Sequence, residues 1–133
     1  MTSRDTALLD TLKQASAGLQ YTSESDYPFD VFSWQTDTLT AEQVLIETKH
    51  PENTPVQVWD LDKFFDQATE EKDWYGPEEK KTVARYKHLV HTLQTTLSDI
   101  QVYRVGAIEL DVYIVGKTPE GALAGLSTKV VET

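Results

Sequence analysis

A long amphipathic helix is predicted near the middle of the chain, beginning at Pro77. Proline is favoured in the first turn of a helix, and the carboxylates of Glu78 and Glu79 interact well with the helix dipole there. Apolar residues then recur every three or four positions, at Val83, Tyr86, Val90, Leu93 and Leu97. Because this spacing places them along one face, the helix must lie on another apolar surface.

After Asp99 the pattern changes from a helical period to simple alternation. Residues 101–105 and 109–115 are predicted as neighbouring strands around Gly106, and residues 122–131 as a final strand. The second strand has two distinct faces, one with Leu110, Val112 and Ile114 and the other with Glu109, Asp111 and Tyr113. Adjacent strands after a helical stretch favour an antiparallel sheet covered by helices.

Three shorter helices are predicted in the first half of the chain from apolar spacing and from start or stop signals. They cover residues 5–17, residues 41–47 after a capping box at Thr40, and residues 61–68 after Asp60. The apolar residues that define the third of these helices are Leu61, Phe64, Phe65 and Ala68.

Two short strands are predicted over residues 29–34 and 56–59, where aromatic and β-branched residues gather. Residues 20–28 are predicted to form a loop that displays Glu24, because Ser and Asp side chains compete for backbone hydrogen bonds and Pro28 ends any helix. Further loops are predicted at residues 49–55 and 73–75. Together these elements predict a single domain over residues 1–133 of the α+β class.

The chain is strongly acidic, with a net charge of −10 and a pI near 4.6. Since affinity for a phosphate backbone comes largely from Lys and Arg, this charge argues against binding to nucleic acid and to anionic membranes. The absence of cysteine excludes disulfides and thiol chemistry. Neither a signal peptide nor a membrane-spanning run is visible, so the sequence predicts a cytoplasmic protein.

Much of the charge lies in one segment, residues 60–79, which contains eight acids and only two bases, Lys63 and Lys72, and so carries −6 of the net −10. Asp73, Trp74 and Tyr75 stand in its middle. Acids attract a basic groove, and aromatic side chains supply apolar anchoring, so the combination indicates a surface that meets a basic protein. The alternative is an acidic face that only keeps the protein soluble.

Catalytic patterns are weak in this sequence. His88 and His91 could approach one metal from a helix, but no third ligand follows at a familiar spacing. Glu109 and Asp111 alternate on one strand face and could act with a histidine in a small hydrolase, although a solvated sheet face explains them equally well. No nucleophile motif, phosphate-binding loop or dinucleotide fingerprint is present, and no cofactor is predicted.

Two carboxylates suit a phosphate-binding or metal-binding partner. Glu24 lies on a polar loop, and its carboxylate could stand where a phosphate sits in a basic, metal-containing pocket; the alternative is an ordinary loop acid. Thr133, the last residue of the sequence, joins a hydroxyl and a carboxylate, both hard oxygen ligands that Mg²⁺ accepts. The alternative for Thr133 is a frayed tail.

Six segments, in order along essentially the whole chain, resemble the nuclease A inhibitor family. They are Leu-Lys-Gln-Ala-Ser16, Ser-Glu-Ser-Asp-Tyr-Pro-Phe29, Asp-Trp-Tyr75, Gln-Val-Tyr-Arg104, Leu-Asp-Val-Tyr113 and Leu-Ala-Gly-Leu-Ser-Thr-Lys-Val-Val-Glu-Thr133. The resemblance implies an α/β/α sandwich with a mainly antiparallel central sheet. It also implies a monomeric protein that is not an enzyme and that blocks a secreted, sugar-non-specific ββα-metal nuclease.

The resemblance assigns roles to four residues. Glu24 matches the loop glutamate that mimics the scissile phosphate, and Thr133 matches the terminal threonine that binds the Mg²⁺ of the nuclease. Asp73 and Trp74 match a second contact site. Residues 36–55 depart most from the family pattern, which leaves open the alternative of an acidic binding module for a different basic partner.

Overall fold

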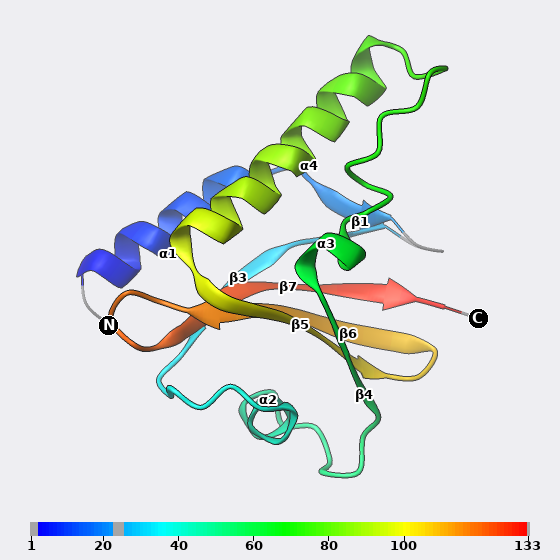
Figure 1. The fold of residues 1–133 in the computed structure, drawn as a ribbon. Coiled ribbons are helices and arrows are strands. Elements are labelled where there is room, and N and C mark those ends of the chain that lie inside the picture. The colour runs from blue at the N-terminus through cyan, green and yellow to red at the C-terminus, as the bar shows by residue number, and fades with distance from the viewer. Residues whose placement is uncertain (1–2, 23–25, 133) are drawn as a thin grey trace.

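The computed structural model describes residues 3–22 and 26–132, which form a central sheet with helices on both faces (Figure 1). The elements in chain order are α1 (Ser3–Ser16), β1 (Gln20–Thr22), β2 (Asp26–Pro28), β3 (Asp30–Trp34), α2 (Ala41–Glu47), β4 (Val56–Trp59), α3 (Leu61–Phe64), α4 (Pro77–Thr96), β5 (Ser98–Gly106), β6 (Glu109–Lys117) and β7 (Leu123–Val131).

The central sheet has five strands in the order β3-β7-β6-β5-β4, and every neighbouring pair is antiparallel. Strands β1 and β2 form a separate antiparallel hairpin in which Tyr21 lies opposite Tyr27. Since β6 and β7 occupy the middle of the sheet, the alternating segments at the end of the sequence form its core. The predicted α+β class is therefore confirmed.

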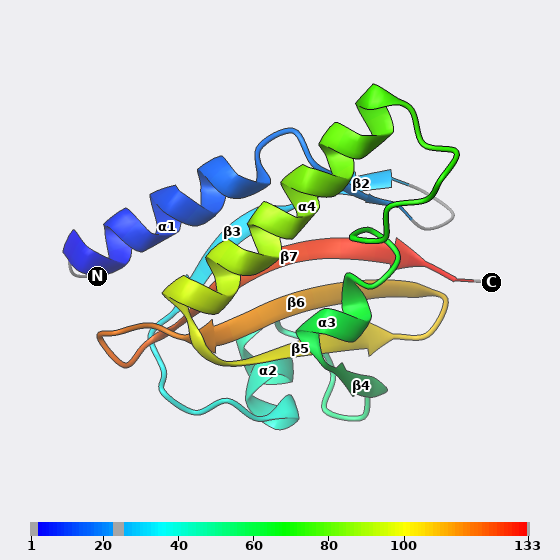
Figure 2. The same ribbon diagram turned by 45° about the horizontal axis from the view of Figure 1, so that its top comes forward.

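Two apolar cores lie on opposite faces of the sheet. Helices α1, α3 and α4 cover one face, where Leu110, Val112 and Ile114 of β6 are buried as predicted. Helix α2 covers the other face and buries Val44 and Leu45 against a cluster of Trp34, Tyr103, Val105, Val115 and Leu123. The layers are those of an α/β/α sandwich (Figure 2). The sheet face under α2 is therefore only partly open to solvent.

Helix α4 begins at Pro77 as predicted, and the Glu79 carboxylate accepts a hydrogen bond from the Gly76 amide at 2.8 Å. The buried face is wider than the predicted stripe. Leu89 is fully buried, whereas Val90 is only partly buried. A helix that contacts both a sheet and a second helix buries a broader face than one that contacts a single surface, and α4 lies on both α1 and the sheet.

The loop prediction for residues 20–28 is wrong, because the described parts of this segment form the β1–β2 hairpin. A tertiary contact holds it: the Tyr21 ring stacks on Phe64 with centroids 4.2 Å apart, and the Tyr21 hydroxyl donates to the Phe64 carbonyl at 2.9 Å. Helix α3 ends at Phe64 rather than at Ala68, because Phe65 leaves the α-helical conformation (φ −99°, ψ 9°) and the chain continues in turns.

Candidate partner-binding surface

Three segments that are distant in sequence lie at one end of the molecule. They are the last residue of β1 with the first residue of β2, the loop between α3 and α4, and the last residues of β7. Figures 1 and 2 show these three segments on the same side of the molecule from two directions. The predicted contacts Glu24 and Thr133 lie outside the described residues. The structure places their nearest described neighbours, Thr22, Asp26 and Glu132, in these segments.

Asp73 and Trp74 lie on the loop between α3 and α4, as predicted. The Trp74 side chain is 75% exposed and is the most exposed large apolar side chain in the described part of the chain. Its ring meets Tyr75 edge-on with centroids 4.7 Å apart, and the Lys72 ammonium lies 5.9 Å from its centroid. Asp73 is also exposed. Because Trp74 contributes little to the core, its indole is available to another protein.

A groove of about 730 Å³ opens beside Trp74, between α3, the following loop and the start of α4. Its lining includes the aromatic side chains of Tyr21, Trp59, Phe64, Trp74, Tyr75 and Tyr86. Burial raises the pKa of Tyr21 and the pKa of Tyr86 above the value of a free tyrosine, so both hydroxyls remain neutral hydrogen-bond donors. Sequence reasoning missed Tyr21 and Trp59, because only the fold brings them beside residue 74.

All eight acids between residues 60 and 79 are exposed. Few of them are neutralised within the described chain: Glu71 lies 3.8 Å from Lys80, and Glu78 lies 3.9 Å from Lys81. Exposed pairs of this kind are weak, so the segment keeps a negative field around the aromatic groove.

A family model for nuclease A inhibitor-like protein matches residues 6–133, which is nearly the whole chain. The chain belongs to this family. A search of curated proteins with the sequence of this chain finds no match. The family is of an inhibitor type, and its description makes a nuclease the kind of partner to consider for the surface around Trp74.

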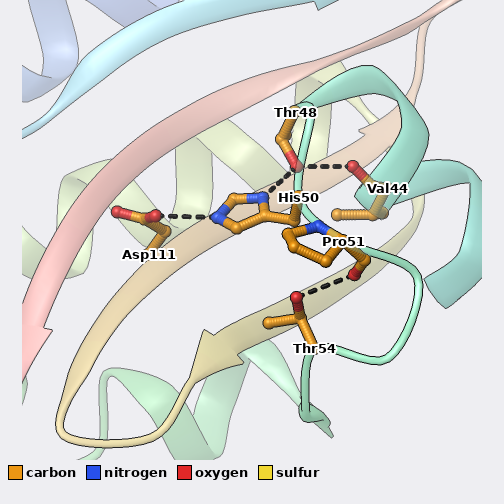
Figure 3. Close-up of polar contacts among 6 residues, drawn as sticks. All are labelled: Val44, Thr48, His50, Pro51, Thr54 and Asp111. Atoms are coloured by element: carbon orange, nitrogen blue, oxygen red, sulfur yellow. Dashed lines mark hydrogen bonds and ion pairs between the residues drawn. The ribbon is translucent and has the colours of Figure 1, made fainter.

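A further polar cluster surrounds His50 in the loop after α2, on the sheet face that α2 covers (Figure 3). His50 Nε2 is 2.9 Å from Asp111 Oδ2, and His50 Nδ1 is 2.6 Å from Thr48 Oγ1. An acid, an imidazole and a hydroxyl in a row are also the parts of a nucleophilic triad. The hydrolase alternative, which named Asp111, Glu109 and a histidine, therefore has to be tested against the contacts of Thr48.

The Thr48 hydroxyl donates to the carbonyl of Val44 at 2.7 Å, and Thr48 is the residue that caps the end of α2. Thr48 Oγ1 thus lies within hydrogen-bonding distance of both this carbonyl and His50 Nδ1. The cluster joins the loop after α2 to β6, because Asp111 lies in β6. This arrangement gives His50 and Asp111 a structural role in holding the loop against the sheet.

No group of three or more His, Asp or Glu side chains that could hold a metal ion is found within residues 3–22 and 26–132. His88 and His91 both lie exposed on α4. None of the helices in this described part of the chain is both long enough and apolar enough to cross a membrane.

Proposed function

We propose that this protein inhibits a sugar-non-specific, Mg²⁺-dependent endonuclease of the ββα-metal type by occupying its active site as a mimic of nucleic acid. The observation that carries the proposal is the match to the nuclease A inhibitor-like family over nearly the whole chain. In this proposal the protein is a monomeric cytoplasmic inhibitor rather than an enzyme, and it needs no cofactor of its own. The Mg²⁺ belongs to the nuclease.

Glu24 is proposed to fill the position of the scissile phosphate. The nuclease must bind phosphate with basic residues and a metal, and a carboxylate offers the same two charged oxygens to that site. The β1–β2 hairpin supports the role, since Thr22 and Asp26 are paired across the segment that carries Glu24. A hairpin is a narrow element that can enter a groove.

Thr133 is proposed to bring oxygen ligands to the Mg²⁺ of the nuclease. Mg²⁺ prefers oxygen and retains open water positions in nuclease sites, so a carboxylate or hydroxyl from the inhibitor can replace a water molecule. The end of β7 lies at the same end of the molecule as the β1–β2 hairpin, which supports simultaneous contact by both segments.

Asp73 and Trp74 are proposed to form a second contact outside the active site. The acids of residues 60–79 give the long-range attraction that speeds association with a basic groove. The Trp74 indole gives apolar area that slows dissociation once the complex has formed.

Replacing Trp74 with alanine is expected to raise the dissociation rate and to weaken binding by about 2 kcal/mol or more. The fold should not change, because the side chain is 75% exposed. Ile46→Ala is a suitable control, since Ile46 is 67% exposed on α2 at the opposite face of the sheet. Surface plasmon resonance with the nuclease measures both rates. A large loss of thermal stability in Trp74→Ala would show instead that Trp74 belongs to the core.

Adding residues after Thr133 is expected to weaken inhibition far more than adding the same residues before Met1. An extension converts the carboxylate of Thr133 to an amide and crowds the metal. Stability should remain the same in both proteins, because β7 ends at Val131. Inhibition constants measured for the two tagged forms test this directly, and equal constants would remove Thr133 from the site.

The proposed function is tested by complex formation. The protein and a catalytically inactive nuclease of this type should elute together as a one-to-one complex in size-exclusion chromatography with light scattering. Separate elution, together with capture of a different basic protein from the producing cell, would favour the alternative of an acidic binding module.

A further inference from the structure

Arg104 is an unusual residue in the apolar face of the sheet. It follows Val102 on the face of β5 that lies under α3, and its side chain is only 4% exposed. Burying a guanidinium away from water is costly unless the charge is paired and its N–H groups are bonded. A fold that needed only stability could place an aliphatic side chain at this position.

Arg104 has contacts in β4 and at the end of β7. Its Nη1 donates to Gln57 Oε1 at 2.6 Å, and its guanidinium carbon lies 4.0 Å from the centroid of the Trp59 ring. Its Nη2 donates to Oε1 of Glu132. Among the described residues its Nε has no hydrogen-bond partner. The acid that pairs with the buried cation thus lies just beyond the last strand.

Glu132 is held at two points. Its amide donates to the carbonyl of Ile108 at 2.8 Å, which continues the β6–β7 pairing one residue past Val131. Its side chain is bound by Arg104 although it is 52% exposed. A backbone bond and a side-chain bond thus hold the same residue at the end of β7.

The Arg104–Glu132 pair also lies near the hairpin. The pKa of Tyr21 in β1 is raised overall, chiefly by burial of its hydroxyl. The charge of Arg104 opposes this rise in pKa, and the charge of Glu132 adds to it. The geometry agrees with these influences, because the Trp59 ring lies against the Arg104 guanidinium and lines the aromatic groove together with Tyr21.

We infer that Arg104 is a positioning residue: through Glu132 it holds the end of β7 in place beside the hairpin. This inference rests on the proposed function, which assigns residue 133 to the metal of the nuclease. Arg104 itself, being buried, does not touch the partner. Its effect on inhibition is transmitted through Glu132.

The test compares Glu132→Gln and Glu132→Ala with Glu109→Gln and Glu109→Ala. Glutamine retains an oxygen that can accept from Arg104 but removes the charge, whereas alanine removes both. Glu109 is an exposed acid in β6 that pairs with Val131, so its variants lose the same charge at the same end of the sheet. Hydrogen exchange by NMR, corrected for intrinsic rates, is measured at the amide of position 132 and at Val112.

In Glu132→Ala the amide of position 132 should exchange at least about ten-fold faster, with Val112 unchanged, and inhibition should weaken by a similar factor. Glu132→Gln should recover part of both losses, and the Glu109 variants should behave like the parent. Unchanged exchange in Glu132→Ala would overturn the inference. Faster exchange with unchanged inhibition would overturn it as well, because the pair would then be structural only.

The same measurements distinguish failure of this inference from failure of the proposed function. If the parent protein inhibits no nuclease, that function falls, while the exchange rates still decide whether Arg104 orders the end of β7 through Glu132.

Discussion

Replacing Gly125 with alanine is expected to destabilise the protein by at least about 3 kcal/mol, or to prevent folding. A Cβ atom at this position would lie 1.7 Å from the carbonyl oxygen of Ile114 and 2.8 Å from its carbonyl carbon. Gly125 is paired with Val115 on one side and with Phe32 on the other. Because β7 lies between two strands, neither neighbour can move away without breaking the sheet.

Gly121→Ala is the matched control for Gly125→Ala. Gly121 has φ +86° in the turn before β7, but no atom lies within 4 Å of a Cβ added there. Gly121→Ala should lower the free energy of unfolding by only about 1–2 kcal/mol, which is the cost of placing alanine in a left-handed conformation. Urea unfolding followed by circular dichroism gives both values. Equal losses at the two positions would contradict the close approach of β6 and β7 at Gly125.

Replacing Glu24 with glutamine is expected to weaken inhibition by about 2–5 kcal/mol, which corresponds to roughly 30-fold or more in the inhibition constant. Glutamine keeps the shape of the side chain but removes the charge that, in the proposed complex, faces the metal and the basic residues of the nuclease. Much of the loss comes from leaving those partner charges buried without a counterion.

Glu52→Gln is the control for this substitution, because Glu52 is an exposed acid on the loop before β4 and loses the same charge. The melting temperatures of both variants and the parent should agree. An inhibition constant for Glu24→Gln equal to that for Glu52→Gln would exclude Glu24 from the binding site.

Local patterns were sufficient where an element's own side chains decide its structure. Helix α4 has a start signal at Pro77 and a regular apolar face, and β6 and β7 have clear alternation, so all three were predicted close to their observed bounds. The exposure of Trp74 also followed from its place among acids on a loop. These features depend on residues within a few positions of one another.

Features that depend on distant residues were missed. The hairpin is held to the rest of the fold by the contact of Tyr21 with Phe64, which is 43 residues away, and no sequence pattern near Tyr21 indicates that contact. Arg104 was recognised only as part of a motif, although its partners Gln57 and Glu132 are 47 and 28 residues away.

The most direct test of inhibition is the rate at which a sugar-non-specific nuclease cleaves DNA and RNA in the presence of Mg²⁺ as this protein is added. A substrate mimic should suppress both activities with the same inhibition constant, and a higher concentration of either nucleic acid should reverse the effect. Cleavage rates that stay unchanged at an excess of the protein would contradict the proposed function.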